Sequence, residues 1–216
     1  MLPIGDDNSQ RRLFPFVTYM LVAANVLVFL LELVGGEQFI YAWSVIPVRF
    51  LSNPVGGFIT LFTSMFLHAG WIHLGGNMLY LLIFGDNVED RFGHFKFLVF
   101  YVLCGLAAAL AQFIVSMYSD IPTLGASGAI AGVLAAYLIL FPGRRVRVLL
   151  TIWVVNLPAI LVIGAWIAIQ LVSGMGTLAG TSASDGVAYM AHIGGFVAGL
   201  ILTGFMRKKA RPIYYS

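Results

Sequence analysis

Long runs of hydrophobic residues, separated by short polar segments, fill most of this 216-residue chain. Each run is long enough for a helix, and about 20 apolar residues in a helix span the hydrocarbon core of a bilayer. The pattern therefore predicts an all-α polytopic membrane protein, a bundle of six transmembrane helices at 14–34, 71–85, 95–117, 127–141, 146–172 and 187–206. These spans form one domain, 14–206, between a cytoplasmic N-terminal segment, 1–13, and a cytoplasmic C-terminal tail, 207–216. The first ten and the last few residues are expected to be disordered.

The segment between the first two runs, 35–70, is too hydrophobic for an ordinary aqueous loop. Aromatic and branched residues cluster in it between Phe39 and Leu51, and aromatic rings favour the headgroup layer of a membrane. We therefore predict a membrane-embedded first loop. Whether this loop faces a substrate or is a lid that only shields the bundle stays open.

The composition also places the chain in a membrane. Hydrophobic residues make up 60% of it and charged residues 10%, which is too few charges to cover a soluble surface of this size. If the N-terminus is cytoplasmic, all but one of the 12 basic residues lie on the cytoplasmic side, and only Arg49 lies outside. The net charge of +3 therefore indicates a topology with both termini cytoplasmic and contact with the lipid bilayer, not with nucleic acid. The single cysteine, Cys104, excludes an intrachain disulfide.

The fourth run, 127–141, is short, and a serine stands where it begins. As a helix it covers only about 21 Å of a hydrocarbon core about 30 Å thick. If Phe141 marks the cytoplasmic edge, Ser127 lies about 9 Å below the outer surface, and the backbone before it must line a wet cavity or be buried in protein. We therefore predict a short central fourth helix below a cavity that opens outward. Gly125 and Gly128 flank Ser127, which suits a nucleophile on a tight turn at a helix N-terminus.

His192, in the sixth run, is the predicted base. From the helical rise it lies about 8 Å below the outer surface, close to the depth of Ser127. A serine needs a neighbouring base to be nucleophilic near neutral pH, and imidazole is the usual one, although a lone histidine in a span is also compatible with a packing role. Both helices carry small residues that permit the close contact a Ser–His hydrogen bond requires. These are Gly195 and Gly199 in the sixth run and Gly128 and Gly132 in the fourth.

His73 and Asn77 lie four residues apart on one face of the second run, and Asn77 lies near the depth of Ser127. Both carry hydrogen-bond donors, so together with the backbone N–H of Ser127 they are candidates for stabilising an oxyanion. For Asn77 alone, an interhelical hydrogen bond is the alternative. His68 and Trp71, nearer the surface, are expected to be interfacial anchors or residues at the rim of the site.

No acid is well placed to complete a triad. Asp185 precedes His192 by seven residues, which is about 10 Å along a helix and too far to orient the imidazole directly. We therefore expect a Ser127–His192 dyad in which ring packing and helix contacts fix the imidazole. His94 belongs to the cytoplasmic turn after Arg91 and is assigned no catalytic part.

Three motifs resemble those of the rhomboid intramembrane serine proteases. They are His73-Leu-Gly-Gly-Asn77, Gly125-Ala126-Ser127-Gly128 and Ala191-His192-Ile-Gly-Gly195-Phe-Val-Ala-Gly199. The resemblance covers essentially the whole chain, including the turn Glu89-x-Arg91-Phe92-Gly93. It implies a Ser127–His192 dyad, support of the oxyanion by His73 and Asn77, and hydrolysis of peptide bonds in transmembrane protein substrates near the outer membrane face. A prokaryotic inner membrane is the expected location.

Two features depart from the pattern of this family. Several rhomboids carry a tyrosine four residues after the serine, and its ring stacks on the histidine. This chain has Ala131 at that position, so the sequence leaves open what orients His192. The Trp-Arg pair often found in the first loop is also missing, so the packing of that loop is expected to differ.

Two other classes of protein stay open. A transporter would use His73, Asn77 and His192 to line a solute or proton path, but this leaves the glycine-flanked serine without a purpose. A catalytically inactive rhomboid-like protein would capture membrane helices without cutting them. No cofactor or metal is expected, because the chain has no His-Glu-x-x-His sequence and no paired aspartates within the spans. For a protease, we expect substrates to reach the site laterally beside the fifth run, whose outer half has few charges; the oligomeric state stays open.

Overall fold

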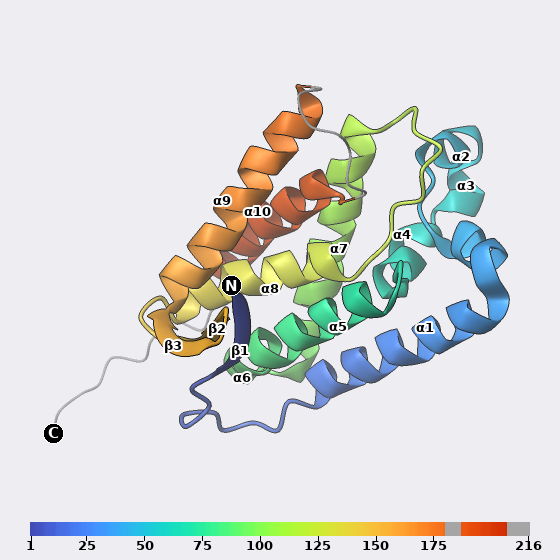
Figure 1. The fold of residues 1–216 in the computed structure, drawn as a ribbon. Helices are drawn as coiled ribbons and strands as arrows, with labels where there is room; N and C mark the ends of the chain where they lie inside the picture. Colours follow the sequence, from blue (N-terminus) through green and yellow to red (C-terminus); the bar gives the residue numbers. More distant parts are fainter. Residues whose placement is uncertain (180–186, 207–216) are drawn as a thin grey trace, which may run out of the picture.

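The protein is a bundle of helices of unequal length around a central helix, α8 (Ser127–Leu140), with a small β-sheet at one end (Figure 1). The computed structural model describes residues 1–179 and 187–206, so that Asp185 and the predicted tail, 207–216, lie outside the described residues. The other long helices are α1 (Phe16–Trp43), α5 (Trp71–Tyr80), α7 (His94–Val115), α9 (Ala159–Leu178) and α10 (Tyr189–Met206). α5 continues through a π-helical turn, η2 (Leu81–Gly85), into α6 (Asp86–Phe92).

Among the described residues, four helices, α1, α7, α9 and α10, are long and apolar enough to cross a membrane. The helical segments Pro54–Phe66 and Trp71–Phe92 add a fifth span if this pair, bent by 77°, counts as one. α8 is apolar but shorter, with 14 residues. The described residues therefore form a mostly helical, multi-pass integral membrane protein, and the count of six spans stays a prediction.

The first loop is built largely of helical pieces. α1 passes through a non-helical residue, Gly36, whose φ of 62° favours glycine, and then continues to Trp43. Short helices follow it along the loop. They are α2 (Pro47–Ser52), α3 (Pro54–Gly57), α4 (Thr60–Thr63) and the 3-10 turn η1 (Ser64–Phe66). The position of this loop within the membrane stays a prediction.

α8 lies in the middle of the bundle, and its residues from Gly128 to Tyr137 are all buried. α10 and α7 pack against it. A Cβ atom at Gly195 would lie 1.9 Å from the carbonyl oxygen of Gly128, and one at Gly199 would lie 2.5 Å from the carbonyl oxygen of Gly132. No side chain fits into such gaps, so α8 and α10 meet backbone to backbone.

The predictions of an all-α fold and of a fifth span over 146–172 are wrong in one region. The chain there first forms an antiparallel hairpin of β2 (Arg145–Leu150) and β3 (Trp153–Pro158), and α9 begins only at Ala159. In β2, exposed arginines alternate with buried Val146 and Val148, which is the period of a strand. The β-branched valines of this hairpin also favour extended backbone.

Residues 2–6 form a strand, which corrects the expectation that the first ten residues are all disordered. β1 (Leu2–Asp6) pairs antiparallel with β2 and completes a three-stranded sheet in the order β1-β2-β3. Asp6, at the end of β1, accepts hydrogen bonds from the Tyr137 hydroxyl, at 2.6 Å, and from the Asn87 amide, at 3.0 Å. The sheet is therefore fastened to the end of α8 that lies opposite Ser127.

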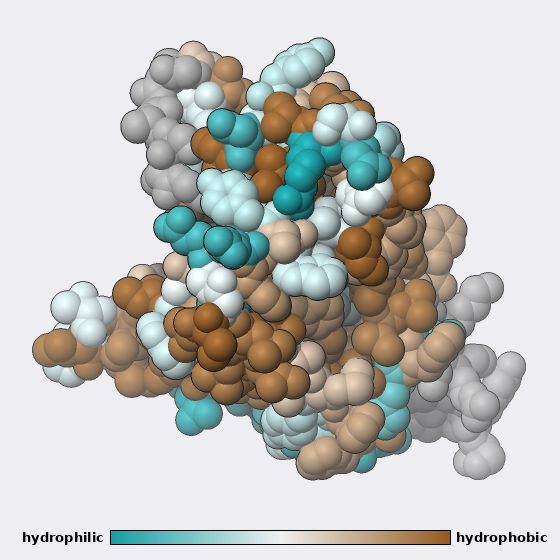
Figure 2. Space-filling view, turned by 90° about the vertical axis from the view of Figure 1, so that its right-hand side faces the viewer, coloured by the Kyte–Doolittle hydropathy of each residue, from teal (hydrophilic) through white to brown (hydrophobic). Residues whose placement is uncertain are grey.

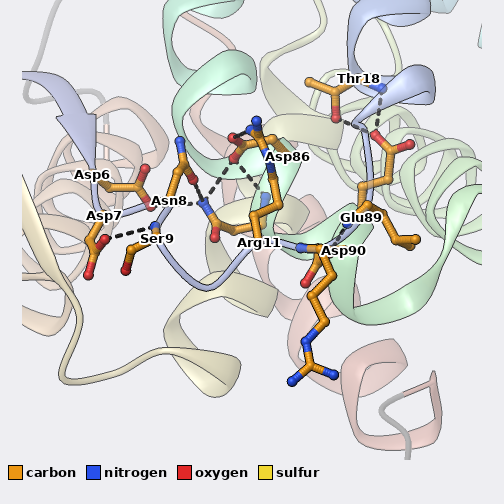
Figure 3. Close-up of polar contacts among 12 residues, drawn as sticks. Asp6, Asp7, Asn8, Ser9, Arg11, Thr18, Asp86, Glu89 and Asp90 are labelled. Atoms are coloured by element: carbon orange, nitrogen blue, oxygen red, sulfur yellow. Dashed lines mark hydrogen bonds and ion pairs between the residues drawn. The ribbon is translucent and has the colours of Figure 1, made fainter.

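Polar contacts with α6 hold the start of α1 (Figure 3). The carboxylate of Glu89, fully buried, accepts hydrogen bonds from the backbone N–H groups of Val17 and Thr18, at 2.9 and 2.8 Å, and from the Thr18 hydroxyl. The first N–H groups of a helix have no acceptor within the helix, so Glu89 supplies one. Nδ1 of His94 lies 2.5 Å from the same carboxylate, which gives His94 a structural contact away from Ser127.

The surface of the bundle is largely hydrophobic. Figure 2 shows the end of the molecule that carries α2 and α3, where hydrophobic side chains cover much of the view and most hydrophilic side chains lie in the upper half. Large hydrophobic side chains are also exposed along α1, α7 and α9, for example Leu27, Ile114 and Val172. Exposure of this kind is expected for helices that face acyl chains.

Candidate active site

The side chains of Ser127 and His192 meet between α8 and α10. Ser127 is the first residue of α8 and His192 lies in the first turn of α10. The Oγ atom of Ser127 lies 2.7 Å from Nε2 of His192. Both residues are partly exposed, so the hydroxyl can be reached from outside the core. The backbone contact between Gly195 and Gly128, next to this pair, holds the two helices close enough for the hydrogen bond.

The first loop holds the backbone that leads into Ser127. Val45 and Thr123 exchange two backbone hydrogen bonds of 3.1 and 2.8 Å, and the N–H of Gly125 donates to the carbonyl oxygen of Ser64 at 2.8 Å. These bonds satisfy polar groups of a non-helical segment inside the bundle. The first loop therefore helps to fix the turn on which Ser127 sits.

His73, in the first turn of α5, lies beside this turn. Its Nδ1 accepts a hydrogen bond from the backbone N–H of Ala69 at 3.3 Å, so the neutral ring carries its proton on Nε2. A Cβ atom at Gly125 would lie 2.9 Å from Cε1 and 3.0 Å from Nε2 of His73, and 3.6 Å from Oγ of Ser127. With a φ of 123°, Gly125 also has a conformation that favours glycine. It therefore leaves room for an imidazole N–H near the serine.

Asn77 lies one turn further along α5 and is 8% exposed. Its Nδ2 atom is buried and has no hydrogen-bond partner among the described residues. The described residues therefore do not form the interhelical hydrogen bond that was the alternative role for this nitrogen of Asn77. Leaving a buried donor unpaired costs about 1–3 kcal/mol, and a substrate oxygen that accepted its hydrogen bond would offset this cost.

Of the two roles expected for His68, the structure does not agree with that of an exposed interfacial anchor, because the side chain is buried; the other, a residue at the rim of the site, stays a prediction. The ring centroid of His68 lies 5.1 Å from that of His73. The backbone N–H of His68 donates to the buried carboxylate of Glu32 in α1, at 3.0 Å. Trp71, in contrast, is exposed, and its ring forms a T-shaped contact with Phe29.

Sequence reasoning missed Gln170, a buried residue of α9. Its Oε1 lies 2.7 Å from Nδ1 of His192, on the side of the ring opposite Ser127. Trp166, one turn earlier in α9, places its ring centroid 5.6 Å from that of His192. Ala131 is fully buried and has no ring to stack on the imidazole. The signal that could have identified Gln170 is a polar amide within an otherwise apolar span.

A cavity lies next to the serine. Small residues from three helices line part of it, namely Gly105 and Ala108 of α7, Gly128 of α8 and Ala191 of α10. Because these side chains are short, the space beside the Ser127 hydroxyl is not filled by the protein itself. It provides room for a water molecule or for a small group of a substrate.

Comparison with known proteins assigns the chain to a family. The family model described as the Rhomboid domain matches residues 55–209, a stretch that contains all three motifs. The chain belongs to the rhomboid family. This assignment agrees with the resemblance in the sequence and with the apolar helices of the structure.

Several curated rhomboids are similar over most of this chain. "Rhomboid protease GluP" of Bacillus subtilis (strain 168) is 32% identical over 189 residues, which cover 86% of this chain and 34% of the relative. "Rhomboid protein 1, mitochondrial" of Saccharomyces cerevisiae is 30% identical over 198 residues, with coverages of 89% and 54%. "Rhomboid protease AarA" of Providencia stuartii is 31% identical over 165 residues, with coverages of 65% and 53%. The chain thus spans about a third to about half the length of these relatives.

Proposed function

We propose that this rhomboid is a serine endopeptidase that cleaves transmembrane segments of membrane proteins near the outer face of the membrane. The hydrogen bond of 2.7 Å between Ser127 and His192 carries the proposal, because it joins a nucleophile to a base next to a cavity. The names of two relatives, GluP and AarA, describe them as proteases. The distribution of basic residues supports a topology with both termini cytoplasmic, and we propose the inner membrane of a prokaryote as its location.

In the proposed reaction, Nε2 of His192 accepts the hydroxyl proton of Ser127 while Oγ attacks the carbonyl carbon of the scissile bond. The imidazolium then donates this proton to the departing amine, the C–N bond breaks, and an acyl-enzyme remains. Water enters through the cavity and loses a proton to His192 as it attacks the ester. The bond between the acyl carbon and Oγ then breaks, His192 donates the proton to Oγ of Ser127, and the carboxylic acid product leaves.

His73, Asn77 and the backbone N–H of Ser127 are proposed to stabilise the oxyanion of the tetrahedral intermediate. Two observations support this role. The tautomer of His73 directs an N–H toward Gly125, and the Nδ2 of Asn77 has no partner among the described residues. Removing one such donor from a serine protease costs about 100- to 1,000-fold in kcat.

Substrates are proposed to reach the site laterally, beside α9. The outer half of this helix exposes hydrophobic residues such as Ile169, Leu171 and Val172, and it carries no charged side chain in the described residues up to Leu178. A substrate helix must unwind locally before its backbone can reach Ser127. Glycine, proline or serine near the scissile bond lowers the cost of unwinding, so substrates with these residues are expected to be cleaved faster.

The test is cleavage of a model transmembrane substrate in liposomes by the wild-type protein and by the Ser127→Ala and His192→Ala variants. We expect both substitutions to abolish cleavage and only the first to remove the site of labelling by a serine-directed fluorophosphonate. Cleavage that persists in both variants would refute the dyad. Binding of the substrate helix without any cleavage by the wild-type protein would instead indicate an inactive helix-binding rhomboid.

A further inference from the structure

We infer that Gln170 of α9 is the residue that positions His192 for catalysis. Its carboxamide oxygen accepts a hydrogen bond from Nδ1–H of His192 and so directs the lone pair of Nε2 to the Ser127 hydroxyl. The effect of this contact on catalysis rests on the proposed function. The contact and the His192 tautomer that it selects do not depend on the proposed function.

The geometry leaves each ring nitrogen of His192 with one partner. Nδ1 lies 2.7 Å from Oε1 of Gln170, and Nε2 lies 2.7 Å from Oγ of Ser127. A neutral imidazole has one donor nitrogen and one acceptor nitrogen. An acceptor at Nδ1 therefore requires the proton there, which leaves Nε2 as the base that a serine nucleophile needs.

Trp166 restricts the same ring from one turn earlier in α9. Its ring lies at a tilt of 40° to the imidazole, with the centroids 5.6 Å apart. Ala131 of α8 supplies no ring, whereas Gln170 and Trp166, which both contact the imidazole of His192, come from α9. A neutral amide can fix the tautomer as a carboxylate does, but it places no negative charge beside the imidazolium.

The position of Gln170 also connects substrate access to catalysis. α9 is the helix beside which substrates are proposed to pass, and a movement of its outer half away from α10 would withdraw Oε1 from Nδ1. His192 would then lose the partner that selects its tautomer. The Ser–His pair would regain its reactive form when α9 returns.

The tautomer of His192 is the direct test, because it is measured without any substrate. In protein labelled with ¹⁵N-histidine, the His192 signals are identified by their absence from His192→Ala, and the proton is located by NMR. We expect the proton on Nδ1 in the wild-type protein and in Gln170→Glu, which keeps an acceptor oxygen, and a mixture of tautomers in Gln170→Met. A wild-type proton on Nε2 would overturn the inference, since the amide would then donate its own N–H to Nδ1.

Activity measurements distinguish positioning from a role in packing alone. We expect Gln170→Met to lower kcat about tenfold or more with little change in KM, and Gln170→Glu to restore most of this loss. The matched control is Leu161→Met, near the start of α9, whose side chain is exposed and lies outside the proposed substrate path. Equal activity of Gln170→Met and Leu161→Met would also overturn the inference. If Gln170→Met does not fold, the tautomers of the wild type and of Gln170→Glu alone decide whether Gln170 positions His192. Cleavage by Ser127→Ala would refute the proposed function, but it would not change the tautomer result.

Discussion

α8 and α9 are neighbours in the bundle, but they differ in how much of each helix is buried against the rest of the protein. α8 is buried along most of its length and touches α10 through backbone atoms at Gly128 and Gly132. In the outer half of α9, only Gln170 and Gly174 are buried. The proposed nucleophile therefore belongs to a helix that is buried along most of its length, and the side chains that contact the proposed base belong to a helix that is mostly not buried in its outer half. A protease whose substrates pass beside α9 needs a fixed nucleophile and a neighbouring helix that can move.

The largest effect is expected from a methyl group placed between α8 and α10. In Gly195→Ala, the new Cβ would lie 1.9 Å from the carbonyl oxygen of Gly128, so the helices must separate. A displacement of about 1 Å at a catalytic group costs about 100-fold in rate, and overpacking costs about 1–3 kcal/mol of stability. We expect cleavage to fall by about this factor or more and the midpoint of thermal unfolding in detergent to fall as well.

The same helix provides the control for this substitution. Outside its own helix backbone, a Cβ atom at Gly204 would meet no atom of the described residues within 4 Å, so Gly204→Ala should leave cleavage unchanged and should not lower the unfolding temperature. In Gly199→Ala, the new Cβ would lie 2.5 Å from a backbone oxygen, so the loss of cleavage should lie between those of Gly195→Ala and Gly204→Ala. Equal rates for all three variants would show that the close contact of α8 and α10 does not hold the Ser–His pair.

A smaller but reversible effect is expected from joining α9 to α10. A Cβ atom at Gly174 would lie 3.2 Å from Cβ of Tyr189, close to the separation of about 3.5–4.5 Å in a disulfide. In the double variant Gly174→Cys/Tyr189→Cys, oxidation should lower cleavage of a transmembrane substrate at least tenfold, and reduction should restore it. Labelling of Ser127 by a small fluorophosphonate should continue in both states, because the dyad and its contact with Gln170 stay intact.

Each single cysteine variant serves as a control for the chemistry of oxidation. The native Cys104 is buried and is not expected to interfere. If the oxidised double variant cleaves membrane substrates as fast as the reduced one, α9 does not need to move away from α10. Lateral access beside α9 would then be wrong, while the proposed chemistry at Ser127 would be unaffected.

The contrast between the two helices also explains what could be predicted from the sequence. The fourth run and α8 both begin at Ser127, because a glycine-flanked serine followed by an apolar run marks the start of this helix. The valine-rich start of the fifth run does not distinguish a helix from a strand, because a short apolar run is compatible with either. Only pairing with β1, far away in the sequence, shows that this segment is part of a sheet.

Side chains that act across the bundle were harder to predict. Gln170 stands alone in an apolar run, and its partner His192 lies 22 residues further along the chain. Glu89 was recognised as part of a turn but not as the acceptor for the first N–H groups of α1. Both roles depend on which helices pack against each other. The spacing of residues within one helix does not predict which helix becomes its neighbour.

The smallest effect is expected at the opposite end of α8, where the sheet connects the two helices. Asp6 of β1 accepts a hydrogen bond from Tyr137 of α8, and the hairpin paired with β1 leads directly into α9. Burial raises the pKa of Asp6 from 3.8 to about 6, against the effect of the hydrogen bond from Tyr137. A carboxyl group whose pKa is higher in the folded state stabilises that state below the unfolded pKa, and this contribution is lost as the pH rises through about 6. The shift corresponds to at most about 3 kcal/mol, reduced by the partial exposure of the site.

Hydrogen exchange of the β1 amides, corrected for the intrinsic rate, should therefore show stronger protection at pH 5 than at pH 7.5. Asp6→Asn should remove this difference, because an amide side chain does not titrate. Asp7→Asn is the matched control: it makes the same change in charge at an exposed position and should retain the pH dependence. If both variants show the same pH dependence of protection, the net charge of the first residues controls the pairing of β1 with the sheet, and the burial of Asp6 does not. Cleavage should change little in either variant, because Ser127 stands at the other end of α8 and is fixed there by α10 and the first loop.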